Sequence, residues 1–89
     1  MLDAASLGEP FPNPSAGSVS AVLVLESPCQ VRATVYDIRG NWISCILDGP
    51  RPAGEQEIIW SGEAPAGVYL LHVEASGESF TRRILKLNK

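Results

Sequence analysis

Apolar residues alternate with polar residues along much of this chain, and that two-residue period restricts the possible folds more than any other feature. In residues 30–37, Val31, Ala33 and Val35 take every second position, and Arg32, Thr34 and Tyr36 take the alternate positions. Successive side chains of a β-strand point to opposite faces, so this pattern predicts a strand with one buried and one wet face. No segment carries the 3.6-residue period of an amphipathic helix through three turns. The sequence therefore predicts an all-β protein.

Turn-forming residues separate the apolar segments at the spacing of a β-sandwich. We expect six strands, over residues 19–25, 30–37, 41–47, 55–60, 68–76 and 79–87, and a seventh from part of residues 6–11. Gly40 is expected to have a positive φ in the turn between the second and third of these strands. The chain has 89 residues, the size of one domain. The predicted fold class is all-β, an immunoglobulin-like antiparallel β-sandwich of six or seven strands.

A Gly-x-Tyr step opens the strand after residue 66. In immunoglobulin-like sandwiches a tyrosine at such a corner donates a hydrogen bond to the backbone a few residues upstream. We expect Tyr69 to do so, with Gly67 adopting a backbone conformation that a Cβ would oppose. Trp60, which follows Ile58 and Ile59, is expected in the core, and the environment of Trp42 is left open.

Composition excludes several classes of protein. With 45% hydrophobic and 19% charged residues, the chain is too apolar for a disordered tail. Its longest apolar run covers residues 21–25, whereas a membrane-spanning helix needs about 20 residues. No basic segment followed by an apolar stretch occurs near the N-terminus, so we expect no signal peptide in this chain.

The two cysteines are predicted to be free thiols. A tight turn after Tyr36 pairs it with Trp42, and in that register Cys45 lies opposite Ala33, four residues from Cys29. At about 3.3 Å per residue the separation is on the order of 13 Å, whereas a disulfide joins Cα atoms at most about 7 Å apart. Both residues share the parity of the inward positions, so we expect them to be buried. No Cys-x-x-Cys spacing is present, and no zinc site is expected.

Catalytic constellations are missing from the sequence. His72 is the single histidine and alternates outward, beside Glu74, without a second metal ligand or a nucleophile at a suitable spacing. No Gly-x-Ser-x-Gly step, glycine-rich phosphate loop or Asp-x-Asp calcium run occurs. A sandwich this small also has little room for a ligand pocket. We therefore expect no enzyme activity, no cofactor, no metal and no small-molecule substrate.

Positive charge is concentrated at the end of the chain. Four of the seven basic residues lie in the last eight positions, where no Asp or Glu occurs: Arg82, Arg83, Lys86 and Lys89. This basic end is compatible with an interaction segment, or with a solvated edge strand whose cations discourage aggregation. Nucleic acid is a poor candidate partner, because the rest of the chain is acidic and the aromatic residues are not interleaved with a basic patch.

Five segments together resemble the C-terminal sorting domains of type IX secretion cargo. They are Glu-Pro-Phe-Pro-Asn-Pro at 9–14, Val-Tyr-Asp-Ile-Arg-Gly at 35–40, Pro-Ala-Gly-Glu with the later Trp at 52–60, Pro-Ala-Gly-Val-Tyr at 65–69 and Thr-Arg-Arg-Ile-Leu-Lys-Leu at 81–87. The match covers residues 9–89 in order. Glu55 and Gln56 replace a histidine-centred step, Ser61 stands where an aspartate often follows the tryptophan, and the cysteines are not family features.

The resemblance implies a secretion signal that is read by other proteins. The chain divides into a linker over residues 1–9 and a sorting domain over residues 10–89, with the cargo domain upstream. Partners would be a shuttle protein of the outer-membrane translocon and a sortase that removes the domain. The location would be the periplasm, then the cell surface or medium of a Gram-negative bacterium. Carried over by position, the recognition residues are Gly67, Val68, Tyr69, Arg83, Lys86 and Leu87.

A mechanism compatible with these residues is β-augmentation, in which the terminal strand presents a free backbone edge and alternating cations to a partner. Two other functions remain as alternatives. One is an immunoglobulin-like structural or assembly module, such as the spacers of flagellar hook-capping proteins. The other is a carbohydrate-binding module, which would need Trp42 or Trp60 exposed on a flat surface.

Overall fold

Seven strands and no helix make up the computed structural model, which describes residues 4–87. The strands are β1 (Ala5–Leu7), β2 (Val19–Leu25), β3 (Cys29–Asp37), β4 (Trp42–Arg51), β5 (Gly54–Trp60), β6 (Gly67–Ala75) and β7 (Glu78–Lys86). The all-β prediction is therefore confirmed. Lys89 and the first three residues of the expected linker lie outside the described part. Within residues 4–87 no helix is long and apolar enough to cross a membrane.

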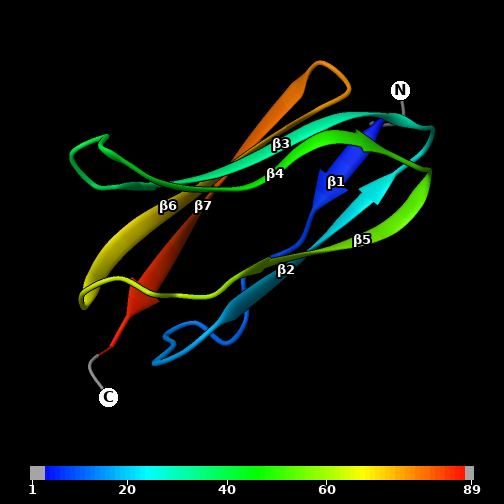
Figure 1. Cartoon of the computed structure of the whole chain (residues 1–89). Coiled ribbons are helices and arrows are strands. Elements are labelled where there is room, and N and C mark those ends of the chain that lie inside the picture. The colour runs from blue at the N-terminus through cyan, green and yellow to red at the C-terminus, as the bar shows by residue number, and fades with distance from the viewer. Residues whose placement is uncertain (1–3, 88–89) are drawn as a thin grey trace.

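The strands form two antiparallel sheets that pack face to face (Figure 1). One sheet has the order β1-β2-β5 and the other the order β4-β3-β6-β7. In a constant-type immunoglobulin domain the fourth strand pairs with the fifth, whereas here β4 pairs with β3. The predicted sandwich is confirmed, and β7 lies at the edge of the four-stranded sheet.

The alternation of apolar and polar residues along the strands forms the core. Val31, Ala33 and Val35 of β3 face Leu23 and Ile58 of the other sheet, and each of the five is at most 2% exposed. Burying a valine or leucine side chain stabilises the fold by about 1.5–3 kcal/mol relative to leaving it exposed. The strand faces were therefore predictable from the period-two pattern.

One position departs from that pattern. Thr34 was expected on the wet face of β3, yet it is 4% exposed. It lies between His72 of β6 and Cys45 of β4 in the register of the sheet, and neighbours on both sides shield a short side chain from water.

The tyrosine corner predicted at residues 65–69 is confirmed. The Tyr69 hydroxyl donates a 2.6 Å hydrogen bond to the Pro65 carbonyl. Its ring packs against Trp60, with 5.2 Å between the ring centroids, and Trp60 is 4% exposed. Trp60 is thus a core residue and offers no platform for a sugar ring, whereas Trp42 is 62% exposed.

Most strand ends differ from the prediction by one residue, and two boundaries differ by more. β1 begins at Ala5, and both Ala5 and Leu7 are buried in the core, so the expected linker over residues 1–9 is wrong for its last part. β4 continues to Arg51 through a segment that was expected to be a loop. Pro50 has no N–H to donate, and a strand tolerates it because β4 lies at the edge of its sheet.

The cysteines are free, as predicted, but Cys45 is exposed and Cys29 is half-buried. Tyr36 pairs with Trp42 as expected. A bulge between Val35 and Tyr36 then shifts the register of the β3–β4 ladder, so that Cys45 lies opposite Thr34 rather than Ala33. A shift by one residue turns a side chain to the other face of the sheet, and the predicted burial of Cys45 is therefore wrong. Cys29 packs against the core as its parity predicts, but it is only half-buried.

The β3–β4 turn is organised by Asp37. Its carboxylate accepts hydrogen bonds from the backbone N–H groups of Arg39 and Asn41, both at 2.9 Å, and from the Asn41 side-chain amide at 3.0 Å. Gly40 has the expected positive φ, at 86°. The backbone and side-chain hydrogen bonds from Asn41 hold the pKa of Asp37 below its ordinary value of 3.8.

We expect Tyr69→Phe to lower the free energy of unfolding by about 1 kcal/mol, because the hydrogen bond to Pro65 is lost while the ring remains. Urea denaturation measures the change. Tyr36→Phe is the matched control, since Tyr36 is half-buried on the outer face and should change stability little. Equal effects of the two substitutions would contradict the role of the corner.

The pH dependence of stability should report on Asp37. A carboxylate whose pKa is lower in the folded than in the unfolded state stabilises the fold above its unfolded pKa, and the contribution disappears as pH falls through the folded pKa. The stability difference between the wild type and Asp37→Asn should be largest near neutral pH and should shrink below the ordinary pKa of 3.8. Denaturation series at several pH values measure it, and a pH-independent difference would refute this account.

Candidate functional site

The candidate recognition strand, β7, is paired along only one of its edges by a strand of its sheet. In an antiparallel strand the N–H and C=O of one residue point to the same edge, and successive residues alternate between edges. The N–H and C=O of Leu85 bond to residues outside the sheet. The backbone groups of Arg83, Leu85 and Leu87 therefore point away from β6. What lies along this outward edge decides whether a partner strand has access to it.

The segment between β1 and β2, residues 8–18, covers part of that edge, and we call it the strap. The Asn13 side chain donates from Nδ2 to the Arg83 carbonyl at 2.8 Å and accepts from the Leu85 N–H at 2.9 Å. Ser15 continues the contact with its backbone: its N–H donates to the Leu85 carbonyl, and its carbonyl accepts from the Leu87 N–H. The expectation of a free backbone edge at residues 83–87 is therefore wrong.

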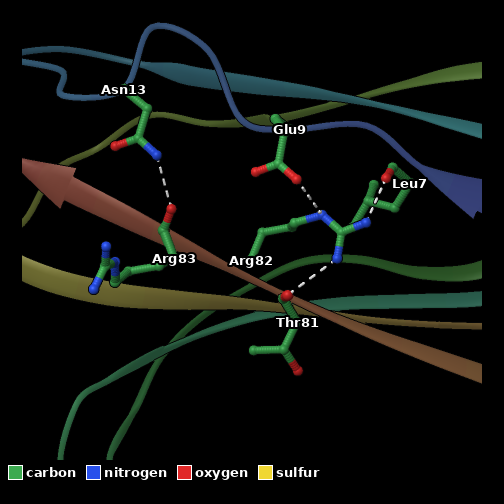
Figure 2. A network of polar contacts seen from close by, with 6 residues as sticks. All are labelled: Leu7, Glu9, Asn13, Thr81, Arg82 and Arg83. Atoms are coloured by element: carbon green, nitrogen blue, oxygen red, sulfur yellow. Dashed lines mark hydrogen bonds and ion pairs between the residues drawn. The ribbon is translucent and has the colours of Figure 1, made fainter.

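Arg82 ties the N-terminal end of the strap to β7 (Figure 2). Its Nη2 donates to the Leu7 carbonyl at 2.6 Å, and its Nη1 donates to the Thr81 carbonyl at 3.2 Å. The Glu9 carboxylate lies 3.3 Å from Arg82 Nε, an ion pair that holds the start of the strap beside the guanidinium. Arg82 thus serves contacts within the domain.

Lys86 ties the other end of the strap. This residue is 3% exposed, and its Nζ donates a 2.6 Å hydrogen bond to the Gly17 carbonyl. The same Nζ lies 5.9 Å from the centroid of the Trp60 ring, which gives a buried cation a second favourable contact. A Cβ at Gly62 would collide with the Gly17 carbonyl and Lys86 Nζ, so glycine is required there. The expectation that Lys86 presents its charge on the surface is therefore wrong.

A mixed apolar and cationic surface lies on the outer face of the four-stranded sheet. Across β6 and β7, Val68 pairs with Leu85 and Leu70 pairs with Arg83, and we call these four residues the outer patch. Leu85 is 38% exposed, and Leu87, just past the strand, is 48% exposed. Arg83 forms no ion pair with any residue in the described part of the chain.

A pocket of about 430 Å³ joins this surface to the strap. It is lined by Asn13, Pro14, Val68, Arg83 and Leu85. A partner that contacts the outer patch would therefore also contact residues 13 and 14 of the strap.

The structure divides the six predicted recognition residues into two groups. Val68 and Arg83 lie in the outer patch and Leu87 follows it, so these three are accessible. Tyr69 and Lys86 are buried beside Trp60 and support the strands from within. Gly67 begins β6 with φ of 152°, a conformation that residues with a Cβ rarely adopt.

Two residues that sequence reasoning did not single out, Asn13 and Ser15, make the contacts that cap β7. Asn13 belongs to the Pro-Asn-Pro step, whose prolines indicate only an extended segment. A signal was present, because an asparagine side chain carries one donor and one acceptor and can imitate a backbone amide. Its target, 70 and 72 residues away in sequence, was not visible in that signal.

The polar residues of the sheet show no catalytic arrangement in this part of the protein. His72 Nδ1 lies 3.2 Å from Thr81 Oγ1, and its Nε2 lies 4.0 Å from the Glu74 carboxylate. Among residues 4–87 no group of three or more His, Cys, Asp and Glu side chains is placed to hold a metal ion.

Comparison with known proteins bears on both fold and role. The fold is similar to that of the sensor domain of the anti-sigma factor RsgI4 of Pseudobacteroides cellulosolvens, with a TM-score of 0.60 over 100% of both chains. At 13% sequence identity this likeness shows the fold alone. No curated protein matches the sequence significantly.

The secretion system C-terminal sorting domain family matches residues 9–87, nearly the whole chain. Domains of this family are the C-terminal signals of the type IX secretion system, which exports cargo proteins through the outer membrane of Gram-negative bacteria. The chain belongs to this family of sorting domains.

Proposed function

We propose that this domain is a non-catalytic export signal, read by a protein of the outer-membrane translocon through β6 and β7. The observation that carries the proposal is the outer patch, where a cation that has no ion pair within residues 4–87 lies among exposed and half-buried aliphatic side chains. Contiguous exposed apolar surface on a small soluble domain marks an interaction site. The charge would orient the partner and speed encounter, while the apolar contacts supply most of the affinity.

The predicted recognition residues have different roles in this proposal. Val68, Arg83 and Leu87 contact the partner directly. Tyr69 and Lys86 act through the fold, since they hold the ends of β6 and β7 against Trp60 and the strap. Gly67 lets the chain enter β6 from the loop that carries Pro65.

The expected position of the cargo leaves the outer patch accessible to a receptor. The domain measures 40 Å along its longest axis, and the start of β1 and the end of β7 lie at opposite ends of it (Figure 1). Cargo attached before β1 would stand away from the end of β7. A receptor could then approach the outer patch and Leu87 without meeting the cargo.

The route of the precursor is also part of the proposal. The cargo enters the periplasm by its own N-terminal signal, a shuttle protein delivers it to the translocon, and a sortase separates the domain at the cell surface. Because Ala5 and Leu7 are core residues, cleavage is expected on the N-terminal side of β1. The linker then ends before residue 5, and the sorting domain begins with β1.

Export of a reporter tests the assignment. Residues 1–89, fused behind a signal peptide and a reporter protein in a host with type IX secretion, should bring the reporter to the surface. Arg83→Glu should lower surface reporter about tenfold, because a charge reversal in an interface costs more than the 1.4 kcal/mol that a tenfold change represents. Surface labelling of the reporter in intact cells measures the effect.

The matched control is Arg39→Glu, which makes the same charge change in the exposed β3–β4 turn. Both variants should fold, since neither side chain packs in the core. Equal export of the two variants would remove Arg83 from the recognition surface. Failure of the wild-type domain to export the reporter would refute the sorting function itself.

A further inference from the structure

The outward edge of β7 is the place where an added strand would bind, and in the free domain it is occupied. Four of its backbone groups between residues 83 and 87 are bonded to the strap: the carbonyls of Arg83 and Leu85 and the N–H groups of Leu85 and Leu87. β-Augmentation uses such groups for its affinity. A partner strand cannot add here while the strap is in place.

The strap is a poor substitute for a strand. Only two residues make the four bonds, and one of them, Asn13, uses its side chain in place of a backbone amide. Ser15 contributes a single isolated parallel bridge, opposite Lys86. The neighbours Pro12, Pro14 and Ala16 are exposed, so they add little burial along the edge. A regular strand could make the same bonds and add side-chain contacts.

The strap is also held at its two ends, and in its middle the buried Ser15 donates hydroxyl hydrogen bonds only to Gly17 and Ser18 of the strap itself. Arg82 holds the Leu7 carbonyl at one end, and Lys86 holds the Gly17 carbonyl at the other. These contacts involve inner-face side chains of β7 and not its outward backbone groups. Residues 13–15 can therefore leave the edge while both anchors and the core remain in place.

We propose that the outward edge of β7, from Arg83 to Leu87, binds an extended polypeptide segment of the export machinery, which displaces residues 13–15 and takes over their hydrogen bonds. This inference rests on the proposed function. The incoming segment should carry an acidic residue beside Arg83 and an apolar residue against Val68 and Leu85, the two aliphatic residues of the pocket that remain when the strap leaves.

Until that partner arrives, the strap protects the edge. An uncovered apolar edge strand pairs readily with strands of other molecules, which leads to aggregation. The protection weakens recognition, because the apparent affinity of a partner falls with the fraction of domains whose edge is open. Loosening the strap should therefore strengthen recognition, although it removes contacts from the folded domain.

Asn13→Ala tests this directly in the reporter fusion. It removes two of the four bonds, so the Leu85 amide should exchange with solvent about tenfold faster. Export of the reporter, followed by pulse–chase labelling, should become several-fold faster. Asn41→Ala is the control, because it removes an exposed side-chain bond to Asp37 and leaves the strap intact. It should change neither quantity.

A disulfide makes the opposite test. Ser15 pairs with Lys86 in an isolated parallel bridge, and the residues that follow them, Ala16 and Leu87, are exposed and line one pocket. Ala16→Cys with Leu87→Cys, in a chain where Cys29→Ala and Cys45→Ser remove the native thiols, should lock the strap when oxidised. The locked reporter should accumulate in the periplasm, and reductant added to the cells should restore export.

The outcomes separate the two proposals. If the wild-type domain is not exported, the sorting function and this inference fail together. If the wild type is exported, export of the oxidised pair at the rate of the reduced pair would overturn strap displacement alone. If the reduced double-cysteine variant is not exported because Leu87 is lost, the Asn13→Ala variant decides whether the strap is displaced. Faster export of Asn13→Ala supports the inference, and unchanged or slower export overturns it.

Discussion

The hydrogen bonds between the strap and β7 are the constraint on which access to the edge of this domain depends. Backbone groups at the edge of a sheet either bond to water, bond to the protein or bind another chain. In this domain the strand nearest the C-terminus lies at an edge, and the strap is folded back to cover it. The strap and β7 are therefore held together along one side of the molecule. A partner strand can add to this edge only after the strap has left it.

The basic residues at the end of the chain have two different roles. Two of its cations, Arg82 and Lys86, bond to backbone carbonyls of the N-terminal part and serve the fold. Arg83 alone among the cations of β7 points to the outer face and lacks an ion pair in residues 4–87. A cluster of like charges in a sequence is thus divided by the alternation of the strand. The inner cations hold the strap, and the outer cation is available to a partner.

Most of the fold could be predicted because its determinants are local. Alternation places Val31, Val35 and Val73 inward, and the Gly-x-Tyr step places the Tyr69 hydroxyl within reach of Pro65. The errors arise where the structure depends on residues far apart. The bulge opposite Val35 and Tyr36 changes which face Cys45 occupies, and no sequence pattern in residues 42–51 predicts an extra residue in the ladder. The target of Asn13 lies 70 residues away, and the pattern near residue 13 indicates only an extended proline-rich entry segment.

The candidate site shows why recognition residues are hard to read from sequence in an all-β domain. Val68 and Tyr69 are neighbours in the chain but occupy opposite faces, one toward a partner and one toward Trp60. Arg83 and Lys86 likewise belong to one basic segment, and their exposure differs completely because they differ in parity. Short motifs list such residues together although only some of them are accessible. The physical separation matters, because a buried member affects export through the stability of the edge, whereas an exposed member affects it through binding.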